Sequence, residues 1–201
     1  MDARQGALLK NFKYKSKDYL SRLNNACEQI PLDAVELLGD ALVKAWVEKR
    51  QVFIFGNGGS AGNAIHLAND FIFGVSKKFG SGLRVHALPA NVSVITCLAN
   101  DIGYENIFSY QLSVMSNPGD MVIALSGSGN SANVVSALNY SNEAKLNSFA
   151  ILGFSGGECL NLVKTPIHIP IFDMQISEDL QVIIGHILMQ HLFSLRDNVK
   201  S

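Results

Sequence analysis

One stretch constrains the fold more than any other, and it runs over residues 51–74 with the sequence QVFIFGNGGSAGNAIHLANDFIFG. Residues 52–55 are apolar and β-favouring, too few for a helix and typical of a strand buried on both faces. A glycine-rich segment follows at once, and residues 61–73 predict a helix because they are rich in Ala, Leu and Ile and contain no proline. A strand, a glycine turn and a helix in this order aim backbone N–H groups and the positive end of the helix dipole at an anion.

The glycine turn matches neither common nucleotide-binding fingerprint. No lysine follows the glycines, which excludes a Walker-type loop, and GNGGSAG is not GxGxxG. A turn of purely structural importance therefore remains an open alternative at this point. His66 and Asp70 lie four residues apart in the expected helix, so both side chains project from one face of it.

The rest of the chain alternates strand and helix signals. Residues 8–50 predict two amphipathic helices separated by Pro31. Further strands are expected at 85–88, 121–125, 149–152 and 167–171, and further helices at 92–100, 104–115, 134–144 and 177–196. This βαβ succession predicts an α/β fold, a single three-layer α/β/α domain whose mostly parallel sheet has helices on both faces.

A second loop of similar chemistry, SGSGNSAN, occupies residues 126–133 after the strand at 121–125. Ser126, Ser128 and Ser131 offer hydroxyl groups, and Gly127 and Gly129 free the backbone near the start of a helix. An ordinary helix cap would explain one of these serines but not three. Right-handed crossovers place both loops at the carboxyl edge of the sheet, so we expect a site for a phosphate monoester there.

Composition and charge narrow the function further. The formal net charge of −1 argues against a nucleic-acid surface spread over the fold. The three cysteines, Cys27, Cys97 and Cys159, are isolated and odd in number, which is typical of a reducing compartment. The N-terminal residues lack the apolar core of a signal peptide, and no apolar run approaches the length of a membrane span. We therefore expect a cytoplasmic location.

Four blocks of the chain resemble the sugar isomerase (SIS) domain family in their order and spacing. They are GNGGSAGNAIHLANDF, LANDIGYENIF, ALSGSGNSANV and EDLQVIIGHIL. Within that family the chain is most similar to the bacterial phosphoheptose isomerases. The resemblance implies one SIS domain over residues 1–201, with residues 1–50 used in oligomerisation. It also implies conversion of D-sedoheptulose 7-phosphate to D-glycero-D-manno-heptose 7-phosphate, for heptose nucleotides of lipopolysaccharide or capsule, with zinc as the cofactor.

The resemblance also assigns residues to roles. Substrate contacts fall on Asn57, Gly58, Gly59, Ser60, Asn100, Asp101, Ser126, Gly127, Ser128, Ser131 and Glu178. Zinc ligands fall on His66, Asp70, Glu178 and His186, and catalytic roles on Asp70, Glu178 and His186. Three positions depart from the usual pattern of the family, which has Glu in place of Asp70, Gln in place of Glu178 and Thr in place of Gly127.

The chemistry of these residue types agrees with the implied reaction. Converting a ketose phosphate to an aldose phosphate needs a base that takes a proton beside the carbonyl, and an acid or metal that stabilises the enediolate. Asp70 suits the base and His186 the acid, since imidazole titrates near neutral pH. All four candidate ligands are residue types that bind Zn²⁺.

The spacing of Glu178 and His186 bears on assembly. Eight residues correspond to about 12 Å along a straight helix, too far for both side chains to reach one metal. Either Glu178 precedes the helix, or the two residues come from different subunits. We expect a homo-oligomer, most simply a tetramer with D₂ symmetry.

Two alternatives to this reading remain. One is an isomerase or binder of another sugar phosphate, and the other is a non-enzymatic SIS protein that associates with a replication initiator. The four acid/base residues together favour an enzyme, because a binding module does not need them. His86, His168 and His191 have no comparable neighbours in the sequence and are expected to be structural or surface residues.

Overall fold

The computed structural model describes residues 3–197, and side chains from residue 11 onward. Five parallel strands form one sheet in the order β2-β1-β3-β4-β5. The strands are β1 (Gln51–Gly56), β2 (Arg84–Ala87), β3 (Met121–Ser126), β4 (Asn147–Leu152) and β5 (Thr165–His168). The predicted parallel α/β sheet is confirmed. The last strand ends earlier than expected, because residues 169–171 leave the ladder to approach the loop after β4.

The described part of the chain contains eight α-helices besides the sheet. They are α1 (Ala3–Cys27), α2 (Leu32–Val47), α3 (Gly59–Asn69), α4 (Val92–Asp101), α5 (Ser109–Met115), α6 (Ala132–Glu143), α7 (Cys159–Leu162) and α8 (Met174–Leu195). The helix expected at 104–115 is instead a 3₁₀ turn, η3 (Tyr104–Asn106), followed by α5. A second 3₁₀ turn, η2 (Leu88–Ala90), follows β2.

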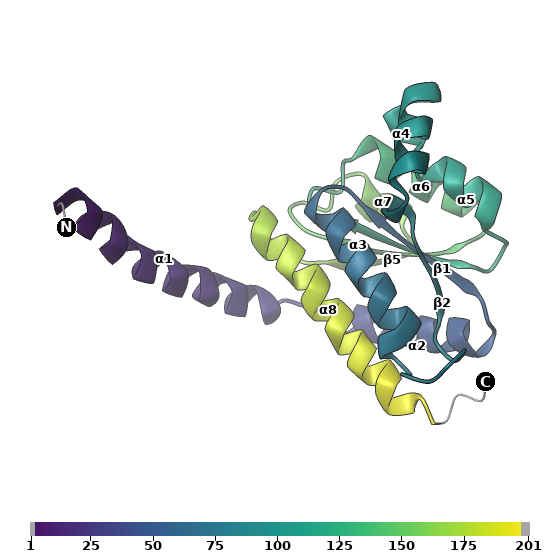
Figure 1. Cartoon of the computed structure of the whole chain (residues 1–201), viewed down its shortest axis with the longest axis horizontal. Coiled ribbons are helices and arrows are strands. Elements are labelled where there is room, and N and C mark those ends of the chain that lie inside the picture. The colour runs from purple at the N-terminus through teal and green to yellow at the C-terminus, as the bar shows by residue number, and fades with distance from the viewer. Residues whose placement is uncertain (1–2, 198–201) are drawn as a thin grey trace.

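The central strands bury both of their faces. In β1, Val52 and Ile54 belong to one apolar cluster while Phe53 and Phe55 belong to another, and all four are fully buried. The first cluster is completed by α2, α3 and α8, and the second by α4, α5 and α6. The result is the expected three-layer arrangement (Figure 1).

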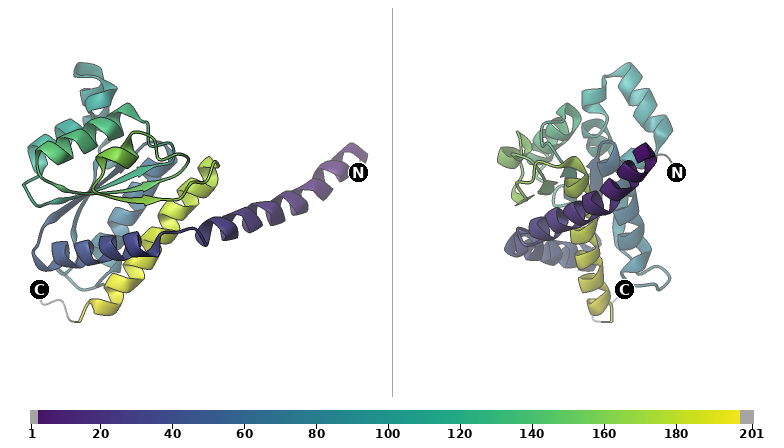
Figure 2. Two further views of the ribbon diagram at one scale, coloured as in Figure 1. Left: turned by 180° about the vertical axis from the view of Figure 1, so that it is seen from behind. Right: turned by 90° about the vertical axis from the view of Figure 1, so that its left-hand side faces the viewer.

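Helix α1 differs from the other helices in its surroundings. Its N-terminal part projects away from the body of the molecule, while its C-terminal part lies near the start of α8 (Figure 2). Phe12, Tyr14 and Leu20 on this helix are largely exposed. No helix among the residues described is long and apolar enough to span a membrane.

The helix expected at 61–73 begins two residues earlier and changes character at its end. After Asn69 the backbone widens into a π-helical turn, η1 (Asp70–Gly74), in which the Val75 N–H donates to the Asp70 carbonyl. π-turns inside helices frequently occur at functional sites. Asp70, a candidate base and metal ligand, is the first residue of this turn.

Candidate active site

The glycine turn after β1 depends on two of its glycines. Gly58 adopts a φ of +55°, in the left-handed region that favours glycine, and precedes the first residue of α3. A Cβ atom on Gly59 would overlap the carboxylate of Glu178, which reaches the turn from α8. Residue 59 must therefore lack a side chain for Glu178 to lie against the start of α3.

The serine loop follows β3, the neighbour of β1, at the same carboxyl edge. The buried Ser126 hydroxyl accepts a hydrogen bond from the Gly129 N–H at 3.0 Å and so shapes the loop from within. The Ser128 hydroxyl accepts from the Asn130 N–H at 3.3 Å. Ser131 stands at the N-cap of α6 but makes no side-chain capping bond. Ordinary capping therefore does not explain its hydroxyl.

A pair of amide side chains joins the two loops. The Asn57 Nδ2 donates to the Asn133 Oδ1 at 2.8 Å, and the Asn133 Nδ2 donates back to the Asn57 Oδ1 at 2.9 Å. The Tyr104 hydroxyl also donates to the Asn57 Oδ1, at 2.9 Å. Asn57, expected to bind substrate, thus uses its amide to position the glycine turn. Neither Asn133 nor Tyr104 stood out in the sequence, although Asn133 closes the SGSGNSAN stretch.

A polar seam fixes α3 against α8. The buried Gln181 donates to the Ser60 hydroxyl at 3.0 Å. Asn63 donates to the Gln181 side-chain oxygen at 2.9 Å and to the Glu178 carbonyl at 3.0 Å. Ser60, expected to contact substrate, is buried in this seam. These bonds set the register of the two helices that carry the candidate metal ligands.

Three of the four expected metal ligands converge one to two turns farther along the same helices. The Nε2 atoms of His66 and His186 lie 2.8 Å apart. The Asp70 Oδ2 lies 3.5 Å from the first of these atoms and 3.4 Å from the second. These three atoms all lie within 4.8 Å of one another.

This donor set fits a transition-metal ion of the Zn²⁺ type. Ligand bonds of about 2.0–2.2 Å at tetrahedral angles put neighbouring donor atoms about 3.4 Å apart, close to the separations between the carboxylate and the two imidazoles. The two Nε2 atoms, 2.8 Å apart, would have to separate by about 0.6 Å to bind one ion. Two imidazoles and one carboxylate also form a typical catalytic set, with three protein ligands and one open position.

Glu178 does not join this cluster within one chain. It lies inside α8, five residues into a helix that begins at Met174, and its carboxylate lies beside Gly59. The eight residues between it and His186 correspond to about 12 Å of helix. One alternative left open by the sequence was that Glu178 precedes the helix. It is wrong, because Asp173 caps α8 by accepting from the Ile176 N–H.

The LAND block occupies the end of α4. Asn100 and Asp101 are exposed, and the Asn100 amide donates to the Asp101 carboxylate at 2.7 Å. The Cys97 thiol lies 3.5 Å from the same carboxylate. Their role as substrate ligands stays a prediction.

Two of the histidines set aside from the sequence have structural partners. The half-buried His86 stacks on Phe53 and its Nε2–H donates to the Gln51 side-chain oxygen at 2.9 Å. Burial, followed by the charge of Arg84, lowers the pKa of His86. The His168 Nε2–H donates to the Phe154 carbonyl at 3.0 Å. Both imidazoles are thus engaged away from the cluster of His66 and His186.

Comparison with known proteins identifies the family. The SIS-domain family model matches residues 15–153. The phosphoheptose isomerase of Geotalea daltonii is 38% identical over 154 residues, which cover 77% of this chain and 78% of that relative. This chain belongs to the SIS-domain phosphoheptose isomerases. The resemblance seen in the sequence is thereby confirmed.

Two further comparisons extend the family relationship and the fold. The probable phosphoheptose isomerase of Thermoplasma volcanium is 33% identical over 175 residues, covering 87% of this chain and 86% of that one. The structure of a phosphoheptose isomerase from Neisseria gonorrhoeae superposes with a TM-score of 0.84 at 23% identity, covering 91% of this chain and 99% of that one. The second likeness shows that the parallel sheet and its surrounding helices are those of the family.

Proposed function

We propose that this phosphoheptose isomerase converts D-sedoheptulose 7-phosphate to D-glycero-D-manno-heptose 7-phosphate in the cytoplasm. The product would feed the synthesis of heptose nucleotides for lipopolysaccharide or capsule. The observation that carries the proposal is the convergence of His66, Asp70 and His186 in a chain whose relatives bear this activity in their names. The serine loop supplies the group that would hold the phosphate.

The reaction moves one proton between adjacent carbons. A base takes the proton from C1 of the ketose, an enediolate forms, and a proton returns at C2, so that O1 becomes the carbonyl oxygen. We assign the base to Asp70, because its carboxylate is partly buried beside two imidazoles. We assign to the imidazole of His186 the proton that O1 loses and O2 gains, since imidazole titrates near neutral pH.

His66, Asp70 and His186 would hold a zinc ion, which as a Lewis acid would stabilise charge on the enediolate oxygens; the proton transfers of Asp70 and His186 would then fall to their atoms that do not bind the ion. Asn133 and Gln181 act indirectly. The first keeps the glycine turn and the serine loop in register, and the second keeps α3 and α8 in register. Positioning of this kind matters because a displacement of about 1 Å can cost about a hundredfold in rate.

Assembly as a homotetramer completes the proposal. Helix α1, whose N-terminal part projects from the body of the molecule (Figure 2), exposes Phe12, Tyr14 and Leu20, a surface suited to a second copy of the chain. Glu178 lies too far along α8 to reach the cluster of its own chain, so a contribution from a neighbouring copy is the arrangement that would make it a ligand. Light scattering that gives a monomer with full isomerase activity would contradict this.

Incubation of the purified protein with sedoheptulose 7-phosphate tests the activity directly. We expect an aldose 7-phosphate product, and in D₂O we expect deuterium at C2, because the base exchanges its proton with solvent. The His66→Ala variant should lose bound zinc, measured by elemental analysis, together with turnover. Absence of product from a zinc-loaded, folded protein would refute the assignment, and fructose 6-phosphate serves as the control ketose.

A further inference from the structure

The first turn of α8 lies directly on the serine loop. A Cβ atom on Gly127 would lie 2.6 Å from the sulfur of Met174, 3.2 Å from its methyl carbon and 3.8 Å from the Ser177 Cβ. The thioether therefore occupies the space that a side chain at 127 would take. Met174 is 38% exposed, so it borders both the loop and the open space beside it.

Met174 and Glu178 share one face of α8, since they lie four residues apart. The first contacts the serine loop at Gly127, and the second contacts the glycine turn at Gly59. The first two turns of α8 thus lie across both loops at the carboxyl edge of the sheet. A ligand held by the two loops would meet Met174 at its phosphate end.

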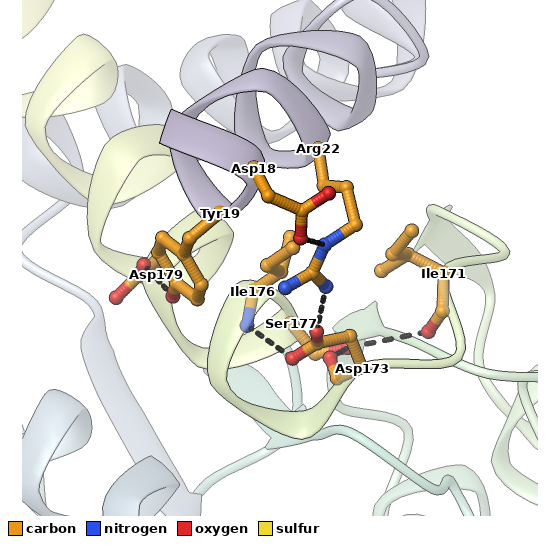
Figure 3. A network of polar contacts seen from close by, with 8 residues as sticks. All are labelled: Asp18, Tyr19, Arg22, Ile171, Asp173, Ile176, Ser177 and Asp179. Atoms are coloured by element: carbon orange, nitrogen blue, oxygen red, sulfur yellow. Dashed lines mark hydrogen bonds and ion pairs between the residues drawn. The ribbon is translucent and has the colours of Figure 1, made fainter. Parts of the chain in front are cut away.

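A polar network from α1 holds this first turn in place (Figure 3). Arg22 pairs with Asp18 on its own helix at 3.0 Å and with Asp173, the capping residue of α8. Tyr19 donates to Asp179 one turn later. Asp173 also accepts from the Ile176 N–H at 3.2 Å, so one carboxylate both caps α8 and binds α1.

The protonation behaviour of Asp173 agrees with this double role. Its partial burial alone would raise the pKa of the carboxyl group, but the hydrogen bonds from Arg22 and Ile176 outweigh that effect and lower the pKa. The carboxylate is therefore charged, and paired with Arg22, throughout the neutral range.

We propose that Met174 is a specificity-determining residue that forms an uncharged wall of the phosphate subsite in place of a side chain on Gly127, and that Arg22 is a positioning residue acting through Asp173. This inference deepens the proposed function and rests on it. A thioether is flexible and carries no charge, so it adapts to the phosphate and excludes water without repelling it. Excluding water strengthens the hydrogen bonds that the loop offers to the anion.

A charge placed at 174 tests the wall. Met174→Glu adds a carboxylate and Met174→Gln is its neutral isostere. A unit charge about 6 Å from a dianion in a water-like dielectric should raise KM about tenfold. We expect KM of Met174→Glu to exceed KM of Met174→Gln by this factor. The difference should shrink with added salt, while kcat changes less than twofold. Gln190→Glu, an exposed change about 24 Å farther along the same helix, is the matched control and should leave KM unaltered.

Equal KM values for the Glu and Gln variants would overturn the inference for Met174. That result differs from a failure of the proposed function, in which the unmodified protein itself would not isomerise sedoheptulose 7-phosphate. A Glu variant whose kcat falls while KM is constant would also overturn it, since the carboxylate would then act on the chemical step.

Asp173→Asn tests the positioning role of Arg22, because asparagine keeps the helix cap and removes the charge that Arg22 binds. We expect KM to rise by two- to fivefold with kcat unchanged, and we expect no further rise when Asp173→Asn is added to Met174→Ala. Arg22→Met should reproduce the effect. Additive changes in KM, or a lower melting temperature with KM unaltered, would show that the network is only structural and would overturn this part.

Discussion

Replacing Gly185 should disturb the candidate metal cluster, although Gly185 is not one of its ligands. It lies on α8 beside His186 and faces Leu67 on α3, next to His66. A Cβ atom at 185 would lie 2.9 Å from the Leu67 Cδ1 and 3.0 Å from its Cγ, and closer still to Cδ2. Leu67 is only 2% exposed and cannot swing into solvent.

The magnitude follows from these distances. Carbon atoms pack at about 3.5–4.0 Å, so Gly185→Ala demands that α3 and α8 separate by roughly 1.5 Å, to clear the nearest Leu67 methyl, or that Leu67 leave its rotamer. Overpacking of this kind costs about 1–3 kcal/mol. At about 2–4 °C per kcal/mol for a chain of this length, the melting temperature should fall by several degrees. Separation by about 1 Å or more should lower kcat at least about a hundredfold, because the proposed base Asp70 and the proposed acid His186 lie on different helices.

Differential scanning calorimetry and isomerase kinetics measure the two effects. The double variant Gly185→Ala with Leu67→Ala removes the overlapping atoms, and it should recover part of the kcat lost in the single variant. Leu67→Ala alone is the control for the cavity, which costs about 2–5 kcal/mol. A Gly185→Ala protein with unchanged melting temperature and kcat would refute the claim that close packing here sets the cluster.

The remaining predictions concern the loops, the carboxylates and α1. Ser128→Asp should abolish sugar-phosphate binding in a calorimetric titration while the melting temperature is retained, and unchanged affinity would remove the serine loop from the site. Asp70→Asn and Glu178→Gln should each lower kcat severely, and the double variant should lose less than the product of the two single losses. Full activity and full zinc content in Glu178→Gln would mean that Asp70 acts alone. Burial, the hydrogen bond to Asp179 and the charge of that carboxylate raise the pKa of Tyr19 to about 12. The stability contributed by Tyr19 is then fully present below about pH 10, the ordinary tyrosine pKa, and is lost as the pH rises towards 12. An absorbance titration should show one tyrosine that ionises late, and persistence of this late step in Tyr19→Phe would contradict the assignment.

Much of the fold could be predicted because its signals are local. The four apolar residues of β1 have no polar position to expose, so they require cover on both faces, and the structure buries them between two layers of helices. The end of α3 was not foreseen, because nothing in the sequence distinguishes a π-turn at Asp70 from one more α-helical turn. The break between η3 and α5 was missed for a similar reason, since residues 104–115 contain no proline or internal glycine.

The site could be predicted in part. The i, i+4 spacing brings His66 and Asp70 together through local geometry alone, but it does not indicate that His186 lies 2.8 Å from His66. That contact depends on two helices 120 positions apart running side by side. Asn133 and Tyr104 could not be singled out from the sequence, because their partner Asn57 is distant in the chain and a lone asparagine or tyrosine carries no motif.

The sequence by itself determined the family, the parallel sheet and the chemistry of the two loops, because strand length, glycine placement and residue spacing act over a few neighbouring residues. Only the tertiary structure decided which of those residues meet. It joined His66, Asp70 and His186, placed Glu178 beside Gly59 instead, and laid Met174 on Gly127. The physical reason is that the packing of α8 against the sheet and α3 fixes these contacts, and such packing depends on side chains from the whole chain at once.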